Sequence, residues 1–590
     1  MGLVSLGLQV MAIFRSACQL LLVLLIPLAI LLFVRNDLLQ TGNIDPYIYT
    51  AFIHDYAETA SRFPGTYYST RLAHILPNAL AAATFGDYAG YIGVRYLQLV
   101  AATLSIYVIA RHYGSILPAC FVTLFFCSHV WLLRALLWEH YDGTVVVYAL
   151  VGLALLLPRK VEILHHFGAG FVFAWAINGN PMGLVIAAAY GPTWLIERSG
   201  RPLGSKLASG GAAVAGLILG YGLLVAGMMS INPKAGWDFD KATFAMISWI
   251  ASGGAANWFM SFREIFLVNH FFQSLSLLLF ICLAVVAILN SDGSQERKKS
   301  IGAFAFVTTM TAIYLIFHFG LHAGALSVPF YLSFSLPACV VALSALLGQW
   351  KPTNDWRTGA IFALFFSIQL IFWSNADLLA IELDHRTYDN ANAPRFETMR
   401  PAALEVVLPL MCLSFVGLFA CVLFRRVRHH SKLFPILILG ILFTSNALFL
   451  RIDTVRIFGE PHHRDIEWDV RNGALYLQSV IAKSVPRGAP VRFWYGTGDS
   501  NLDLVQSGQL WLWSRLSHFG ASDAQMPKLD DGVRARLKEA KYIAILGNPS
   551  EIKAAQQALD LEGLNVEIID KGKYRGKTWG GYDVLVGKLK

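Results

Sequence analysis

Apolar segments long enough to cross a bilayer recur along most of this 590-residue chain. A helix needs about 20 apolar residues to span the hydrocarbon core of a membrane. Thirteen segments come near that length, the two between 167 and 196 being short; they lie near 15–34, 89–110, 115–133, 143–158, 167–178, 182–196, 207–230, 271–290, 301–318, 326–347, 358–374, 401–424 and 433–450. The sequence therefore predicts a polytopic α-helical membrane protein with about 13 transmembrane helices.

The composition supports this class. Only 14% of the residues are charged, whereas soluble proteins carry about a quarter. All seven cysteines lie in apolar segments, so we expect small buried apolar residues rather than disulfides or metal ligands. The net charge of +9 requires no nucleic acid as a partner, because much of it falls in short loops between the predicted spans.

Basic residues in alternate loops predict the orientation of the chain. With the N-terminus inside, every inner loop is basic; these loops carry Arg111, Arg159 and Lys160, Arg198 to Lys206, Arg297 to Lys299, Lys351 and Arg357, and Arg425 to Lys432. The first apolar segment could be a signal peptide, but no small-x-small cleavage site follows it before Arg35. We therefore expect an uncleaved first helix, a cytoplasmic N-terminus and an outer C-terminus.

The polar tail, residues 451–590, differs from the rest of the chain. Short β-like stretches at 491–496, 542–547, 565–570 and 582–587 alternate with helical patterns at 530–541 and 550–563. They predict a small α/β domain on the outer face, next to a transmembrane module over 1–450. The tail has no glycine-rich nucleotide motif, so a lid or interaction module without chemistry of its own is one interpretation.

The first outer loop, residues 35–88, contains two amphipathic helix candidates, at 45–62 and at 69–84. Neither is long and apolar enough to span, so we expect both to lie along the membrane interface. Asp45 stands near the start of the first candidate. Asp142 stands at the outer start of the fourth span, with Glu139 three residues before it, and the two would share a face if the helix began early.

These acids have two interpretations. A carboxylate at the membrane interface is partly desolvated and more basic, which suits a general base acting on a hydroxyl or an amine. Alternatively, each acid only stabilises a helix N-terminus, an effect worth about 0.3–1 kcal/mol.

Basic side chains are predicted on the same face of the membrane. An anionic lipid headgroup would need such donors, because phosphate prefers bidentate arginine; the alternative is that they snorkel to lipid phosphates without a specific ligand. Arg71 is the strongest candidate, since it shares a loop with Asp45. The residues are Arg71, His74, Arg134, Lys234, Lys241 and Arg263.

Two further patterns stand at span ends. His318 and His322 are four residues apart and could form a metal pair, but Gly320 lies between them, and ordinary interfacial histidines are the alternative. The stretch NGNPMG at 178–183 is either a plain turn or part of a cavity lining.

The layout resembles the GT-C superfamily of polyprenyl-phosphate-sugar-dependent glycosyltransferases, which includes protein O-mannosyltransferases and lipid A aminoarabinose transferases. The resemblance covers roughly residues 1–320, from the inner N-terminus and first span to the second acid. The family's first acid matches Asp45 in NIDPYIY, and its second matches Asp142 in EHYDG. Many members double the first acid, whereas here Ile44 and Pro46 flank Asp45, so a divalent metal is not indicated and the cofactor stays open. The WWDxG-like motif of the oligosaccharyltransferases is absent.

The resemblance implies an inverting glycosyltransferase of the bacterial inner membrane with a periplasmic C-terminal domain. A polyprenyl-phosphate-linked sugar would be the donor, and an envelope glycan, lipid or protein the acceptor. Asp45 would act as general base, and Tyr47 and Tyr49 could stack on the sugar or the prenyl chain. A transporter or flippase is the alternative and would predict internal repeats and mid-membrane charges; no repeat is evident. A membrane scaffold without catalysis is a third class.

Overall fold

The structure is a computed structural model that describes mainly residues 56–62, 67–137, 141–157, 162–231, 271–349 and parts of 472–590, with short gaps and isolated residues elsewhere. The described helical body contains α3 (Tyr56–Arg62), α4 (Leu72–Phe85), α5 (Asp87–Tyr113), α6 (Ile116–Cys127), α7 (Val130–Leu137), α8 (Asp142–Leu156), α9 (Glu162–Gly179), α10 (Met182–Glu197), α11 (Leu203–Ile231), α13 (Phe271–Asn290), α14 (Ser294–Leu315) and α15 (Leu336–Gly348).

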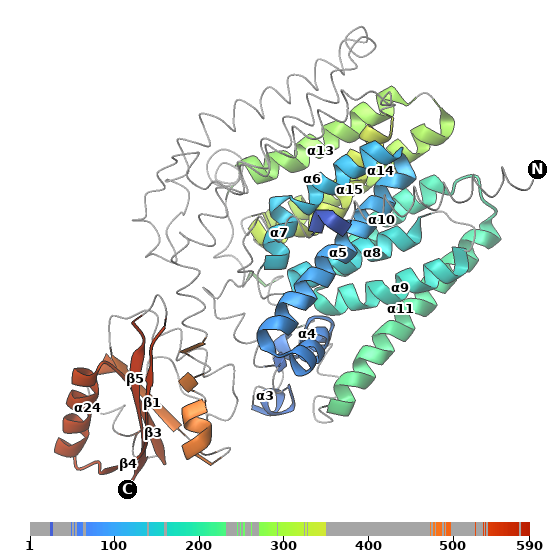
Figure 1. Ribbon diagram of the computed structural model, residues 1–590. Coiled ribbons are helices and arrows are strands. Elements are labelled where there is room, and N and C mark those ends of the chain that lie inside the picture. Colours follow the sequence, from blue (N-terminus) through green and yellow to red (C-terminus); the bar gives the residue numbers. More distant parts are fainter. Residues whose placement is uncertain are drawn as a thin grey trace, which may run out of the picture.

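Consecutive helices run back and forth between two ends of this body (Figure 1). At one end, called the site end, α4 and α8 begin and α9 ends. At the other, called the basic end, α5 and α10 end and α14 begins. The described basic loops gather at the basic end, as their alternation predicts; the side of a membrane that this end faces stays a prediction.

Several helices have the length and composition of membrane spans. Among the described residues, four stretches qualify, and shorter apolar helices lie between them; the four are Ile92–Tyr113, Leu203–Ser230, Ser294–Gly320 and Tyr331–Gly348. The predicted spans at 358–374, 401–424 and 433–450 lie outside the described residues, as does 15–34 apart from 24–27. The predicted number of about 13 helices therefore stays a prediction.

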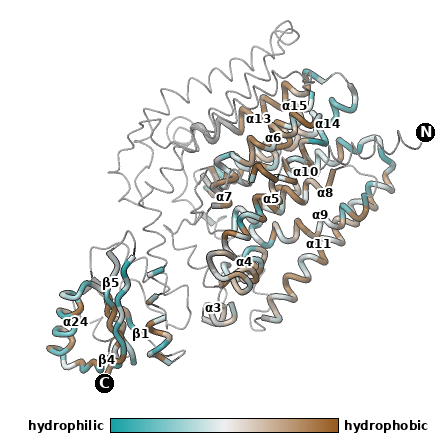
Figure 2. The backbone as a smooth tube through the Cα atoms, in the orientation of Figure 1, coloured by the Kyte–Doolittle hydropathy of each residue, from teal (hydrophilic) through white to brown (hydrophobic). Residues whose placement is uncertain are grey.

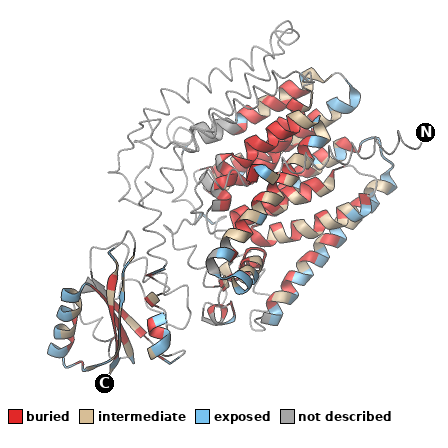
Figure 3. Ribbon diagram, viewed as in Figure 1, coloured by how far each residue is buried: buried red, intermediate tan, exposed pale blue. Residues whose placement is uncertain are grey.

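The helices at the centre of the body are more deeply buried than α11. Helices α6, α8 and α15 are buried almost throughout, whereas α11 carries a row of exposed apolar side chains (Figures 2 and 3). That row includes Leu207, Ile218 and Leu223. An apolar exposed face on a spanning helix is what contact with lipid tails requires, so α11 fits a lipid-facing position.

Helices α9 and α11 pack backbone against backbone. A Cβ atom added at Gly216 would collide with the carbonyl oxygen of Phe167, and one added at Gly170 would collide with that of Ala213. Only glycine permits so close an approach, and small residues commonly mediate helix contacts in membranes.

Two predicted spans differ from the structure. The segment 115–133 was predicted as one helix, but α6 ends at Cys127 and α7 begins at Val130. Between them, Nδ1 of His129 accepts the backbone N–H of Trp131 at 3.2 Å, which closes a turn instead of continuing the helix. The segment 326–347 starts as a 3₁₀ helix, Pro329–Ser335, before α15. The apolar pattern was correctly recognised, but local hydrogen bonds break it.

The C-terminal part contains a mixed sheet in the order β2-β1-β3-β5-β4. Four strands occupy the segments where the sequence predicts them, β1 (Val491–Gly496), β3 (Tyr542–Gly547), β4 (Val566–Tyr574) and β5 (Tyr582–Leu589), and a fifth, β2, is Gln525–Met526. Alternate residues of β3 enter two separate apolar clusters, one of which includes α24 (Pro549–Leu561). The predicted boundary at 450/451 lies outside the described residues.

Candidate functional site

Arg71 lies at the head of α4 and is buried rather than extended towards lipid. It is 1% exposed, and its Nη1 donates to the carbonyl oxygen of Asn178 at 3.3 Å. Its guanidinium lies over the ring of Tyr141, 5.3 Å from the ring centre, a distance at which a cation is attracted to an aromatic face. Because the side chain is enclosed by protein, Arg71 does not extend towards lipid phosphates as a snorkelling residue would.

Asn178, the last but one residue of α9, holds the backbone around Arg71. Its Oδ1 accepts the N–H of Ala73 at 2.7 Å, and its Nδ2 donates to the carbonyl of Thr70 at 2.9 Å. The N-terminal N–H groups of a helix need partners from outside the helix, and Asn178 supplies one from a residue more than 100 positions away. In the NGNPMG stretch, α9 ends at Gly179 and α10 begins at Met182, and Asn178 fixes the head of α4 from the end of α9.

His74, one turn into α4, joins a chain of side-chain hydrogen bonds that crosses three helices. Its Nδ1 lies 3.1 Å from Oγ1 of Thr144 on α8. Nε2 of Gln98 on α5 donates to the same Oγ1 at 2.9 Å, and Nη1 of Arg95 donates to Oε1 of Gln98 at 2.9 Å. His74, Thr144 and Arg95 are all buried.

An aromatic cluster connects the segment 35–88 with the start of α8. The ring of Tyr49 meets those of Tyr68, His74 and Tyr141 edge-on, with centroids 5.5, 5.2 and 5.8 Å away. Tyr49 is fully buried and helical. The stretch that begins at Asp45 thus reaches the site end through Tyr49, although Asp45 itself lies outside the described residues.

Asp142 begins α8 and is fully buried. It is the first residue of the helix rather than its N-cap, which is Tyr141, and the Tyr141 side chain makes no capping hydrogen bond. Gly143 follows, and a Cβ atom there would touch the Ala135 carbonyl of α7 at 2.5 Å. The helix begins at Asp142, and Glu139 lies outside the described residues, so the common face of the two acids stays a prediction.

The structure therefore brings together Tyr49, Arg71, His74 and Asp142 of the predicted site. Six other predicted residues lie outside the description, Asp45, Tyr47, Glu139, Lys234, Lys241 and Arg263, and so does the side chain of Arg134. Gln98 and Thr144 were missed, and Asn178 was noted only as the first residue of NGNPMG. Their signal in the sequence was a hydrogen-bonding side chain inside an apolar segment, which is costly to bury without a partner.

The two histidines of HFGLH have different surroundings. His318 is buried in a short π-helix, Ile316–Gly320, and its Nδ1 accepts the N–H of Leu326 at 3.2 Å. His322 is exposed with φ at 49°. Among the described residues, no three His, Cys, Asp or Glu side chains are arranged to hold a metal ion.

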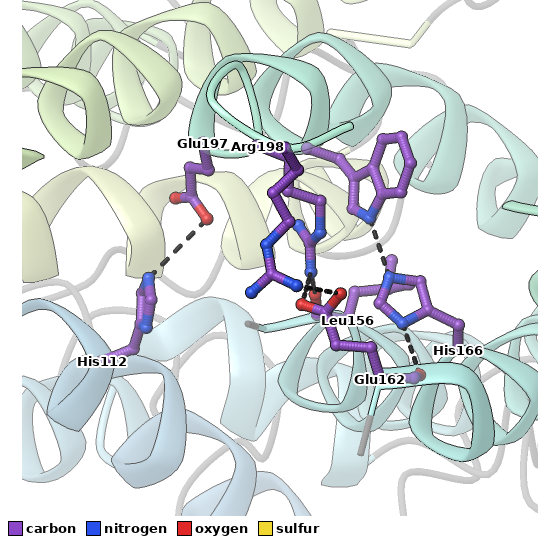
Figure 4. Close-up of polar contacts among 8 residues, drawn as sticks. His112, Leu156, Glu162, His166, Glu197 and Arg198 are labelled. Atoms are coloured by element: carbon purple, nitrogen blue, oxygen red, sulfur yellow. Dashed lines mark hydrogen bonds and ion pairs between the residues drawn. The ribbon is translucent and has the colours of Figure 1, made fainter. Parts of the chain in front are cut away.

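A second polar network lies at the basic end (Figure 4). Arg198 donates to the carbonyl of Leu156 at 2.7 Å and lies 3.6 Å from Oε1 of Glu162. Glu197 accepts from the hydroxyl of Tyr113 at 3.0 Å and lies 3.7 Å from His112. These contacts join the ends of α5, α8, α9 and α10, which gives the network a structural role.

The fold has solved neighbours among lipid-linked sugar transferases. ArnT from Cupriavidus metallidurans bound to undecaprenyl phosphate superposes with a TM-score of 0.47 at 12% identity, over 94% of this chain and 97% of ArnT; its apo state gives 0.47 at 13%, over 95% and 97%. The archaeal oligosaccharyltransferase AglB from Archaeoglobus fulgidus, solved with an inhibitory peptide and a dolichol-phosphate, gives 0.42 at 10%, over 97% of this chain and 74% of AglB.

These neighbours are GT-C glycosyltransferases, the superfamily that the sequence layout resembles. No family model matches the sequence, and no curated protein matches it. Because identities and TM-scores are this low, the function proposed below rests on the residues of the chain itself.

Proposed function

We propose that the chain is an inverting membrane glycosyltransferase. It transfers a sugar from a polyprenyl-phosphate donor to an envelope glycan, lipid or protein acceptor on the outer face of the inner membrane. The observation that carries the proposal is the contact of the Arg71 guanidinium with the ring of Tyr141, the residue that precedes Asp142, at the site end. Anion recognition and carboxylate chemistry are thereby supplied at one end of an apolar helical body.

The charges at the site end suit a phosphorylated lipid. Arginine offers a planar set of donors that matches phosphate oxygens, and Arg71 is held at a fixed place by Asn178 and Tyr141. A polyprenyl chain needs an apolar surface, and the helices below the site end supply one. The donor would enter from the bilayer with its phosphate at Arg71.

Asp45 is proposed as the base. It stands four residues before Tyr49, whose ring lies against His74 and Tyr141. It takes the proton of an acceptor hydroxyl or amine, the acceptor attacks the anomeric carbon, and the bond from that carbon to the phosphate oxygen breaks. Polyprenyl phosphate leaves with the electron pair, and Arg71 stabilises its charge. Asp142 orients the acceptor or the donor.

Burial adds a condition to this mechanism. Arg71 and Asp142 are 1% and 0% exposed, so a lipid phosphate reaches Arg71 only when side chains at the site end move. Excluding water until the donor binds would strengthen every charge interaction at the site and would suppress hydrolysis of the donor. The proposal therefore includes a local opening of the site end.

The test uses purified protein in lipid nanodiscs. Candidate donor sugars are first identified by mass spectrometry of envelope lipids and glycans from a deletion strain. Release of polyprenyl phosphate is then measured for the wild type, Asp45→Asn and Asp142→Asn, with Asp37→Asn as a control from the same loop. Asn preserves capping, so a base at Asp45 predicts a loss of roughly a hundredfold or more and a milder loss for Asp142→Asn.

Two outcomes would contradict the proposal. Transfer by Asp45→Asn within a few fold of the wild type would remove the catalytic role of Asp45. Movement of intact lipid-linked sugar between leaflets, without cleavage of the sugar–phosphate bond, would identify a flippase instead.

A further inference from the structure

We infer that Thr144 and Gln98 are positioning residues that fix the proton of His74 on Nε2. The inference starts from the direction of the hydrogen-bond chain through α5, α8 and α4. Arginine can only donate hydrogen bonds. Because Arg95 donates to Oε1 of Gln98, the amide of Gln98 has one orientation, with its NH₂ group towards Thr144.

The hydroxyl of Thr144 continues the chain in the same direction. Within the described residues, its Oγ1 has two hydrogen-bond partners, Nε2 of Gln98 and Nδ1 of His74. The NH₂ group of Gln98 donates and cannot accept the proton of the Thr144 hydroxyl. Of these two partners, only Nδ1 of His74 can accept it. Thr144 is 1% exposed, and a buried hydroxyl that donates to nothing is costly. The hydroxyl therefore donates to Nδ1.

This arrangement determines the tautomer of His74. A neutral imidazole carries one proton, and the nitrogen that accepts a hydrogen bond cannot carry it. With Nδ1 accepting from Thr144, the proton resides on Nε2. Hydrogen bonds aligned in one direction also strengthen one another, and every link here runs from Arg95 towards His74.

A fixed Nε2–H has a use at this site. His74 follows Arg71 by one helical turn, with its backbone N–H on the Arg71 carbonyl at 3.0 Å. If the proposed function holds, the Nε2–H group of His74 and the guanidinium of Arg71 both donate hydrogen bonds to the oxygens of a prenyl phosphate, from positions one helical turn apart. The reversed tautomer would present a lone pair to the phosphate and repel it.

The tautomer can be measured directly, whatever the protein's substrate. Histidine is labelled with ¹⁵N in the full-length protein in nanodiscs, and His74→Phe identifies the signals of His74. We expect the ¹⁵N chemical shift of Nδ1 to be that of a hydrogen-bond acceptor and that of Nε2 to be that of a protonated nitrogen. This pattern of shifts should be retained in Thr144→Ser and lost in Thr144→Val. A proton on Nδ1 in the wild type would overturn the inference.

A second measurement tests the use of the donor. Binding of geranylgeranyl phosphate is compared with that of geranylgeraniol, which lacks the phosphate. Thr144→Val and Gln98→Leu should weaken phosphate binding roughly three- to tenfold, the scale of one neutral hydrogen bond. Thr144→Ser should bind like the wild type, and Thr144→Val should have no further effect in a His74→Phe background.

The outcomes separate the two proposals. If the wild-type protein binds neither compound, the proposed function is contradicted, but the measured tautomer of His74 is not affected. Phosphate-selective binding that Thr144→Val does not change, or changes equally with His74 absent, would contradict the positioning role.

Discussion

The side-chain amide of Asn178 binds the backbone at the head of α4 from both sides, accepting from Ala73 at 2.7 Å and donating to Thr70 at 2.9 Å. The end of α9 and the loop that carries Arg71 are thereby joined into one unit.

Asn178→Ala should lower both stability and donor binding. It leaves the buried N–H of Ala73 and the carbonyl of Thr70 without these partners, at about 1–3 kcal/mol for each buried group. The measurement is the thermal midpoint together with prenyl-phosphate affinity. Asn180→Ala is the matched control, since it removes one local bond to Met182 N and should leave affinity unchanged. Equal effects of both substitutions would argue against a specific attachment.

Arg71→Lys should weaken donor binding more than it weakens the fold. Lysine keeps the charge but lacks the planar donor set of arginine, and losing one charge-assisted hydrogen bond to phosphate costs about 1.5–3 kcal/mol, which is roughly ten- to a hundredfold in affinity. Arg198→Lys is the control, because Arg198 is equally buried, at 1% exposure, but lies at the basic end. It should lower the thermal midpoint without changing affinity. Unchanged affinity for Arg71→Lys and Arg71→Ala would make Arg71 a structural residue.

Gly216→Ala should destabilise the protein, whereas Gly211→Ala should not. The added methyl group at 216 collides with the Phe167 carbonyl, while a Cβ atom at 211 meets nothing within 4 Å. Overpacking typically costs about 1–3 kcal/mol. Thermal unfolding of the two variants in the same detergent provides the comparison, and similar midpoints would show that α9 and α11 separate easily.

The stability of the C-terminal sheet should show a pH-dependent contribution from Asp570. Hydrogen bonds from the hydroxyl of Ser484, at 2.7 Å, and from the Lys571 N–H lower the pKa of Asp570. A carboxyl whose pKa is lower in the folded state stabilises the fold above its unfolded pKa, and this contribution is lost as pH falls through the folded pKa. The midpoint difference between wild type and Ser484→Ala should therefore shrink at acidic pH; a constant difference would contradict the coupling.

The predicted orientation needs its own test. A reporter active only outside the inner membrane should be active when fused after residue 590 and silent within 425–432. The reverse pattern would remove the common outer face on which the choice of Asp45 and Asp142 depends.

Local patterns in the sequence predicted most of the described helices and strands, and they named Arg71, His74 and Asp142 as candidates for the site. They could not show that Arg71 is enclosed by Tyr141 and Asn178, because those contacts join segments 70 and 107 positions away. Thr144 and Gln98 carried no motif and matter only through the packing of α5, α8 and α4. The break at His129 was missed because hydropathy does not register a side chain that caps a backbone group.

The length of α11 bears on how the protein sits in its bilayer. Its 29 residues make a helix about 43 Å long at about 1.5 Å per residue, against a hydrocarbon core of about 30 Å. Such a mismatch is relieved by tilt, by thickening of nearby lipid or by emergence of the helix ends. Since glycine contacts bind α11 to α9, the two helices would have to tilt together. Bilayer thickness should therefore act on Asn178, at the end of α9, and through it on the loop that holds Arg71.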